Sequence, residues 1–248
     1  MDKTMISYYD LDCNGTLKFS AFLRMVHIAA DINATELGVG FAQLAPLGMS
    51  FVLQRFSAQV YEALPAYGEE VQIRTWPASI ERGTFIRKGE MLDKKSRKRL
   101  EWASLWLLFD LNERKILRPA ALPVDFALMG LGDQGTTVVP EKVDIPADWL
   151  AWEQPHNAYT HTVRYAEVDT NKHVNNAVYG DWAANAAAHP SEEAAFRWQA
   201  FHINYLAETR LNDEIAVTSR KGDNGDILIV GESGARRSFT ARVVCTNS

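Results

Sequence analysis

The segment that decides how this chain is interpreted is Asp169-Thr170-Asn171-Lys172-His173-Val174-Asn175-Asn176. Residues 159–168 before it are typical of a strand, and the alanine-rich residues 174–188 after it are typical of a helix. In an extended segment, side chains two positions apart project from the same face. Asp169, Asn171 and His173 have this spacing. We therefore expect three polar side chains to project together just before a helix begins.

The chemistry of this segment fits a hydrolytic site. A carboxylate, an amide and an imidazole meet the first turn of a helix, where backbone N–H groups lack intrahelical partners and the helix dipole is positive. Such groups can activate water and stabilise an oxyanion. Asp and Asn are also ordinary helix caps, and the segment could be only a capped turn. The histidine in register with them favours a functional site.

The pattern Asp-x-Asn-x-His-Val-Asn-Asn-x-x-Tyr over residues 169–179 resembles the second-half motif of the acyl carrier protein (ACP) thioesterases. The resemblance implies hydrolysis of fatty acyl thioesters. It also implies an α+β fold of two fused hotdog domains, each a long central helix wrapped by a curved antiparallel β-sheet. No metal and no organic cofactor are implied. The implied partner is an ACP bearing a fatty acyl chain, and the sequence leaves a homodimer open.

A second polar group, Glu208, follows Tyr205 by three positions near the end of a predicted strand over residues 197–208. From the residues alone, Glu208 is no more than a charge at the end of a strand. The resemblance implies that it belongs to the catalytic site. Plant members of the family usually have Cys after this Glu, whereas this chain has Thr209. A cysteine nucleophile at that place is therefore excluded.

The predicted catalytic set is Asp169, Asn171, His173 and Glu208, together with the backbone N–H of Val174. We expect Glu208 or His173 to act as general base for a water molecule. Asn171 is expected to orient the water or the imidazole, and Asp169 to hold either of them by hydrogen bonds. The N–H of Val174 is expected to face the oxyanion. Nucleophilic attack by Glu208 itself is left open.

The second half of the chain repeats the first. Residues 12–17 align with residues 169–174, 157 positions later, and residues 68–71 align with residues 212–215, 144 positions later. An internal repeat indicates duplication of one structural unit. We expect each half to contain a short strand, a long helix and then an antiparallel run of strands.

The repeat also separates the halves chemically. Where the second half has His173 and Glu208, the first has Thr16 and Leu64. We therefore expect one active site, in the second half. The predicted domains are an N-terminal hotdog over 1–130 that binds the acyl chain, a linker over 131–155 within a Pro- and Gly-rich stretch, and a C-terminal hotdog over 156–248.

Composition limits the classes of protein to consider. The chain has 248 residues, 47% of them hydrophobic, and a net charge of −5, which does not indicate a nucleic-acid-binding protein. No apolar run is long enough to span a bilayer, and no signal-peptide pattern occurs at the start. Its two cysteines form neither a disulfide framework nor a metal motif. The sequence predicts a cytoplasmic protein.

Two other functions remain compatible with the residues. A hotdog enzyme acting on acyl-coenzyme A would cleave the same bond, and a non-catalytic acyl-binding protein would share the apolar core. Between two predicted strands, the basic segment 94–99 is either a solvated turn or a docking site for the acidic ACP.

Overall fold

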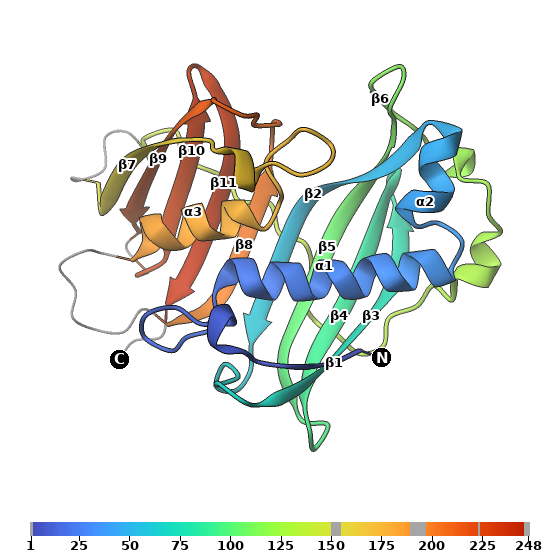
Figure 1. Cartoon of the computed structure of the whole chain (residues 1–248), viewed down its shortest axis with the longest axis horizontal. Coiled ribbons are helices and arrows are strands. Elements are labelled where there is room, and N and C mark those ends of the chain that lie inside the picture. The colour runs from blue at the N-terminus through green and yellow to red at the C-terminus, as the bar shows by residue number, and fades with distance from the viewer. Residues whose placement is uncertain (1, 150–154, 189–196, 223, 246–248) are drawn as a thin grey trace. The chain divides into compact units, whose positions relative to one another are not determined.

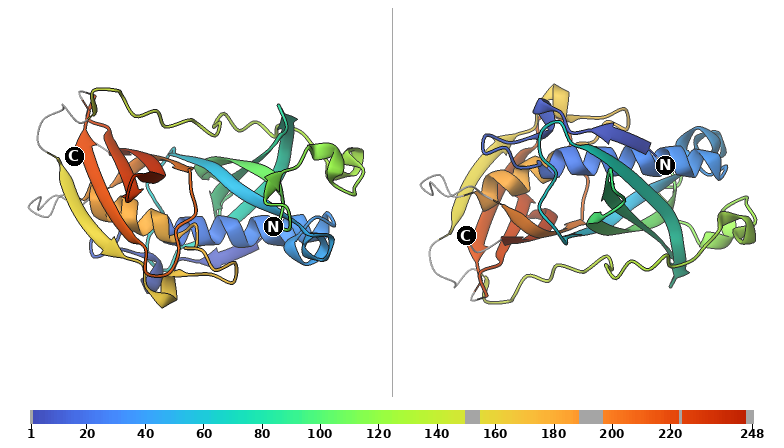
Figure 2. Two further views of the ribbon diagram at one scale, coloured as in Figure 1. Left: turned by 90° about the horizontal axis from the view of Figure 1, so that it is seen from above. Right: turned by 90° about the horizontal axis from the view of Figure 1, so that it is seen from below.

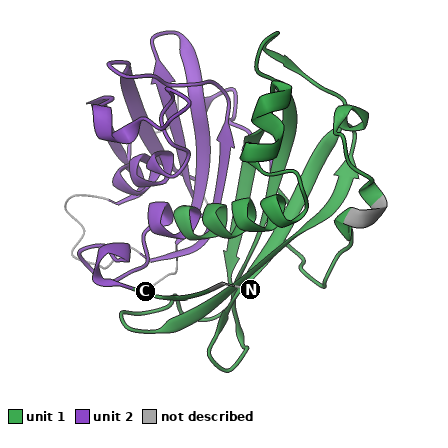
Figure 3. Ribbon diagram, turned by 45° about the vertical axis from the view of Figure 1, so that its right-hand side comes forward, with its two compact units in different colours: residues 1–6, 24–140 green, residues 7–23, 141–248 purple. Residues whose placement is uncertain are grey.

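A computed structural model describes residues 2–149, 155–188, 197–222 and 224–245. The chain forms two compact units (Figure 3). Unit 1 consists of Met1–Ile6 and Arg24–Pro140, and unit 2 of Ser7–Leu23 and Glu141–Ser248. The change from one unit to the other at Pro140 falls inside the predicted linker. Residues 7–23, predicted as part of the first domain, instead group with unit 2.

Unit 1 contains an antiparallel sheet with the strand order β1-β3-β4-β5-β2. Its strands are β1 (Asp2–Met5), β2 (Met49–Val60), β3 (Glu70–Glu81), β4 (Thr84–Asp93) and β5 (Lys98–Asp110), and the short β6 (Lys115–Ile116) pairs with β5. The strand β5 and its neighbours are rich in the apolar residues that a covered sheet needs.

The helices α1 (Phe19–Glu36) and α2 (Phe41–Leu44) follow β1 in the chain. Within unit 1, α1 crosses one face of the sheet, and the irregular segment 130–140 runs along the opposite face (Figures 1 and 2). Val26 and Ala29 on α1 are buried, in keeping with helical spacing. None of the described helices is both long and apolar enough to cross a membrane.

Unit 2 repeats the same strand order, β7-β9-β10-β11-β8. Its elements are β7 (Asn157–Thr162), α3 (Val178–Ala187), β8 (Trp198–Tyr205), β9 (Glu214–Lys221), β10 (Ile227–Ser233) and β11 (Arg236–Cys245). α3 packs against β7, β9, β10 and β11 (Figure 1). A Cβ on Gly180 would lie 3.0 Å from the backbone nitrogen of Ser20, so glycine permits this close approach of α3 to the start of α1.

Equivalent hydrogen bonds link the repeated segments. The N–H of Ile6 donates to the carbonyl of Glu69 at 2.9 Å, and the N–H of Val163 donates to the carbonyl of Asp213 at 2.9 Å. These residues are related by the two offsets read from the sequence. The repeat is therefore present in the backbone as well as in the residues.

Three predicted boundaries near the site were wrong. The strand predicted over 159–168 ends at Thr162, and a 3₁₀ turn follows at Tyr165–Glu167. The helix predicted from 174 begins at Val178, because the side chain of Asn175 accepts the N–H of Ala177 at 2.9 Å and holds a turn there. The strand predicted to reach residue 208 ends at Tyr205.

Candidate active site

Residues 169–173 form a closed turn, not the extended segment that the sequence predicted. The N–H of Asp169 donates to the carbonyl of His173 at 2.9 Å, and the N–H of Lys172 donates to the carbonyl of Asp169 at 3.0 Å. Lys172 has a φ of 66°, in the left-handed region. The prediction that these side chains alternate along an extended segment was therefore wrong. The polar residues lie instead on a closed turn.

Asp169 stabilises this turn through the backbone. Its carboxylate accepts the N–H of Asn171 at 2.8 Å, as in an Asx turn. The predicted hydrogen bond from Asp169 to the side chain of Asn171 or of His173 is not present among the described residues. Asn171 is exposed, with its side chain available to a ligand. The structural role of Asp169 is therefore to stabilise the turn that carries His173.

His173 and Glu208 meet at the centre of the site. The imidazole Nε2 of His173 lies 3.0 Å from the carboxylate Oε2 of Glu208. The two side chains are 25% and 39% exposed, so the pair is open to a water molecule and a substrate. Glu208 was predicted at the end of a strand, but it lies in the loop after β8, and this loop carries its carboxylate to the imidazole.

The N–H of Val174 is already used. It donates to the carbonyl of Thr209 at 2.8 Å, which ties the turn to the loop that carries Glu208. A backbone N–H has one hydrogen, so the assignment of Val174 as oxyanion donor is corrected. The N–H of Asn175 donates to the carbonyl of Glu167 at 2.9 Å. Among the described residues, the next N–H, that of Asn176, makes no hydrogen bond in the turn.

Two arginines that the sequence analysis did not identify hold Glu208. The guanidinium of Arg210 lies 3.3 Å from the carboxylate Oε2 of Glu208. The guanidinium of Arg236, at the start of β11, donates to the backbone carbonyl of Glu208 at 2.6 Å. Arg210 therefore forms an ion pair with the Glu208 carboxylate, and Arg236 fixes the loop that carries it.

Aromatic side chains form the base of the site. The hydroxyl of Tyr205 donates to the carbonyl of Asn176 at 3.1 Å, and its ring lies edge-on to Tyr179 with centroids 5.4 Å apart. Burial raises the pKa of Tyr205, so it stays a neutral donor. Tyr179 also packs edge-on against Phe239 of β11 at 5.5 Å. The start of α3 is thus anchored to the sheet of unit 2.

A second histidine–glutamate pair, absent from the sequence predictions, lies under the turn. Glu167 accepts hydrogen bonds from His161 Nε2 at 2.8 Å, from the backbone N–H of Arg164 at 2.7 Å and from the indole of Trp182 at 3.3 Å. Burial alone would raise the pKa of Glu167, but these hydrogen bonds outweigh it and lower the pKa. This cluster joins β7, the 3₁₀ turn at Tyr165–Glu167 and α3.

Thr209, which stands where plant members of the family usually have Cys, is fully buried at 0% exposure. His27 on α1 has a buried Nε2, and its ring contacts those of Phe56 and Trp106 edge-on. Burial lowers the pKa of His27 to about 4, so this histidine is neutral. No cluster of three or more potential metal ligands occurs among the described residues.

Ion pairs occupy most of the basic segment 94–99. Arg97 pairs with Asp93 at 2.7 Å, Lys98 pairs with Glu101, and Arg99 pairs with Glu69 at 3.0 Å. Hydrogen bonds from the backbone and side chain of Arg97 lower the pKa of Asp93 to about 2. Lys94 and Lys95 are the residues of the segment left to attract an acidic partner.

Comparison with known proteins assigns both halves to one family. The model of the acyl-ACP thioesterase N-terminal domain matches residues 1–121, and that of the acyl-ACP thioesterase C-terminal domain matches residues 153–239. No curated protein matches the sequence significantly.

Solved structures share the fold over nearly the whole chain. An acyl-ACP thioesterase from Bacteroides thetaiotaomicron is 20% identical, with a TM-score of 0.86 over 99% of this chain and 96% of the other. A 12:0-ACP thioesterase from Umbellularia californica is 17% identical, with a TM-score of 0.85 over 100% and 96%. A putative oleoyl thioesterase from Lactobacillus plantarum is 16% identical, with a TM-score of 0.82 over 98% and 93%.

Proposed function

Because the chain belongs to the acyl-ACP thioesterase family, we propose that it hydrolyses the thioester bond of fatty acyl-ACP and releases the free fatty acid, which ends chain elongation. The observation that carries this proposal is the contact of 3.0 Å between His173 Nε2 and Glu208 Oε2, both partly open to solvent. An imidazole beside a carboxylate is suited to take a proton from water.

In the proposed reaction, water attacks the acyl carbonyl. Its oxygen forms a bond to carbon, the carbon–sulfur bond breaks, and the water proton passes through the pair of His173 and Glu208 to the departing thiolate. Either group can be the one that takes the proton first, and attack by Glu208 to give a mixed anhydride is the covalent alternative. Asn171, exposed on the turn, is assigned to orient the water.

The developing oxyanion needs a donor other than Val174. We assign this role to the turn before α3, where the N–H of Asn176 makes no hydrogen bond among the described residues. One such donor is typically worth about 3 kcal/mol in the transition state. The hydroxyl of Tyr205 donates to the carbonyl of Asn176, and this contact fixes the residue whose N–H is assigned as the donor.

We assign the two units as a tandem hotdog, supported by a helix against the sheet and the same strand order in each. Unit 1, whose sequence lacks counterparts of His173 and Glu208, is proposed to receive the acyl chain. Among the described residues, Cys13 and Cys245 form no disulfide, and reduced thiols are usual in the cytoplasm, where we place the enzyme.

The test is hydrolysis of matched acyl groups on two carriers. Purified protein should release fatty acid from acyl-ACP with a higher kcat/KM than from acyl-coenzyme A. Glu208→Gln keeps the shape of the side chain and removes its basicity, so turnover should collapse while the far-UV circular dichroism stays unchanged. A preference for acyl-coenzyme A, or binding without hydrolysis over hours, would reject the proposal.

A further inference from the structure

The face of the unit 1 sheet opposite α1 carries a hollow of about 720 Å³. Its volume falls in the range of small-molecule sites. Its lining comes wholly from unit 1 and includes neither His173 nor Glu208. The lining residues used below are Arg55, Ala78, Arg82, Ile86, Lys88 and Leu105.

Two β-bulges shape this hollow. The pairing of β2 with β5 shifts between Leu53 and Arg55, and the pairing of β3 with β4 shifts between Pro77 and Ser79. Each shift leaves one extra residue, Gln54 or Ala78, and both extra residues line the hollow. A bulge bends its strand and redirects side chains. The hollow therefore results from two bulges that lie at the same height along the strands of the sheet.

The floor is apolar and closely packed. Ala78, Ile86 and Leu105 are 8%, 7% and 9% exposed, and they form one cluster with Trp76. Ile86 pairs directly with Leu105 across β4 and β5. An apolar chain laid on this floor would contact side chains that the protein already keeps from water.

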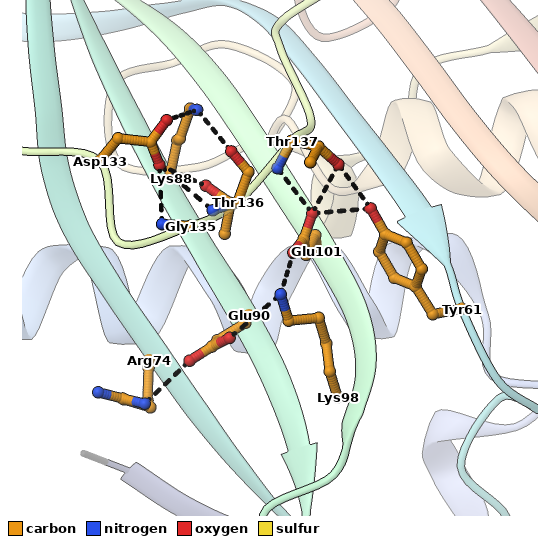
Figure 4. A network of polar contacts seen from close by, with 10 residues as sticks. All are labelled: Tyr61, Arg74, Lys88, Glu90, Lys98, Glu101, Asp133, Gly135, Thr136 and Thr137. Atoms are coloured by element: carbon orange, nitrogen blue, oxygen red, sulfur yellow. Dashed lines mark hydrogen bonds and ion pairs between the residues drawn. The ribbon is translucent and has the colours of Figure 1, made fainter.

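One wall is the segment 133–140, and the sheet holds it in place. The ammonium of Lys88, a residue 8% exposed, donates to the carboxylate of Asp133 at 2.8 Å and to the carbonyl of Thr136 at 2.9 Å. Next to it, the carboxylate of Glu101 accepts the N–H of Thr137 at 3.0 Å (Figure 4). These contacts neutralise Lys88 and give the hollow a fixed side.

Beside the paired Lys88 and Asp133, the hollow has two guanidinium groups and the carboxylate of Glu81, so positive charge is in excess. Arg55 and Arg82 make no ion pair and no hydrogen bond among the described residues. Lys88 and Asp133 neutralise each other, and the carboxylate of Glu81 accepts the hydroxyl of Ser79 at 2.6 Å. Two cations beside an apolar floor match a ligand with an anionic head and an apolar chain.

We propose that this hollow is a second binding site, for the anion of a fatty acid, with its alkyl chain on Ala78, Ile86 and Leu105 and its carboxylate between Arg55 and Arg82. A fatty acid is the product of the proposed function, and only the identity of the ligand rests on that function. The site would bind a product molecule on residues of unit 1 that do not include the catalytic pair.

The test uses dodecanoate below its micellar concentration and the full-length protein. Isothermal calorimetry should give saturable binding, and a diazirine-bearing analogue should label peptides from residues 79–88 or 133–140. Arg55→Gln/Arg82→Gln should weaken this binding roughly tenfold or more, because charge-assisted hydrogen bonds to the carboxylate are lost. The matched control Lys94→Gln/Lys95→Gln removes the same charge elsewhere on unit 1 and should leave binding unchanged.

A cationic amphiphile of equal chain length, dodecyltrimethylammonium, should not label these peptides. Equal labelling by both amphiphiles, labelling only elsewhere, or equal binding by the double Arg variant would overturn the proposal. Hydrolysis of acyl-ACP is measured separately. Failure of hydrolysis would leave a positive labelling result standing, and failure of labelling would leave the thioesterase proposal intact.

Discussion

Two turns of this protein share a backbone and differ in chemistry. In the turn at Asp12, its N–H donates to the carbonyl of Thr16 at 2.8 Å, and in the turn at Asp169, its N–H donates to the carbonyl of His173 at 2.9 Å. Thr16 is 6% exposed, whereas the side chain of His173 is 25% exposed. Both turns therefore have the same backbone hydrogen bond, and only the second turn carries a partly exposed imidazole.

The loops that carry Leu64 and Glu208 are supported alike. Arg99 donates to the carbonyl of Leu64 at 3.2 Å, and Arg236 donates to the carbonyl of Glu208 at 2.6 Å. Leu64 offers no titratable group, yet its loop keeps the arginine. We infer that this arginine serves the architecture of the repeat first, and that the second half adds catalysis to it through Glu208.

The largest expected effect separates the two turns. His173→Ala and Glu208→Ala should each lower kcat by about 10²–10⁴-fold, as is typical for loss of a general base. The double variant should lose little more than the worse single one, because groups that act as one unit are not additive. Single-turnover hydrolysis of acyl-ACP measures this.

Thr16→Ala supplies the control in the other turn. It should leave the chemical step nearly unchanged, although its buried position means that stability must be followed in parallel. Additive losses for His173 and Glu208 would show that the two act independently.

The helices offer a second contrast, since α1 carries His27 and the residue 157 positions later in α3 is Ala184. The pKa of His27 is lowered by burial from 6.5 to about 4. Below pH 6.5 the imidazole of His27 binds a proton in the unfolded chain, whereas in the folded chain it binds one only below about pH 4. The contribution of neutral His27 to the free energy of unfolding is therefore fully present above pH 6.5. It falls by roughly 3 kcal/mol as the pH drops toward 4.

Urea unfolding of the wild type and of His27→Gln between pH 4.5 and 7 measures this. The variant should show the weaker pH dependence. His202, whose pKa burial also lowers to about 4, is present in both proteins, so the difference in slope belongs to His27. Equal slopes would contradict the assignment of a neutral, buried imidazole.

The two supporting arginines should respond differently to loss. Arg99 is 7% exposed and also pairs with Glu69, so Arg99→Gln should cost roughly 2 kcal/mol of stability. Arg236→Gln should lower kcat about fivefold with KM nearly unchanged and only a small loss of stability, since its contact orients the Glu208 loop. Arg236→Lys should restore part of kcat, and a purely structural Arg236 would instead show the pattern of Arg99.

The left-handed position of the turns gives a smaller test. Gly15 has a φ of 75° and Lys172 a φ of 66°. Gly15→Ala meets no atom within 4 Å of its added Cβ, so its cost should be only the backbone strain of about 1 kcal/mol. Lys172→Gly should raise the free energy of unfolding by no more than about 1 kcal/mol. Thermal unfolding resolves both, and a larger loss at Gly15 would show that its turn carries more than conformational strain.

The smallest expected effect concerns ACP docking. Lys94→Glu/Lys95→Glu should raise KM for acyl-ACP several-fold at low salt and leave kcat nearly unchanged, because exposed charges act on encounter and are screened by salt. Steady-state kinetics at two salt concentrations measures this. A KM that does not change would remove the segment 94–99 from the docking surface.

The sequence predicted those parts of the site that depend on residue type. His173 and Glu208 carry distinctive chemistry in a recognisable pattern, and the structure brings them together. The N–H of Val174 was misassigned because its acceptor, the carbonyl of Thr209, comes from a loop that local sequence does not place. Arg236 was missed because an arginine at the start of a strand is common, and its target lies 28 residues away.

The sequence also predicted the strands better than the boundaries of the units. Most strands of both sheets follow their apolar patterns. The membership of residues 7–23 in unit 2 depends on contacts such as the indole of Trp198 donating to the carbonyl of Leu17 at 3.0 Å, across 181 positions. A periodic pattern reports which face of an element is buried, but not which distant element covers it.

That grouping has a consequence for dissection of the protein. The ring of Phe19 stacks on Phe201 at 4.2 Å, so part of the core of unit 2 is encoded before unit 1 is complete. A cut after Pro140 would yield two fragments, and the fragment from Glu141 onward would lack Phe19. We expect neither fragment to fold well alone and the two to reassemble when mixed, as in a split-protein complementation system. Recovered hydrolysis would then report their association.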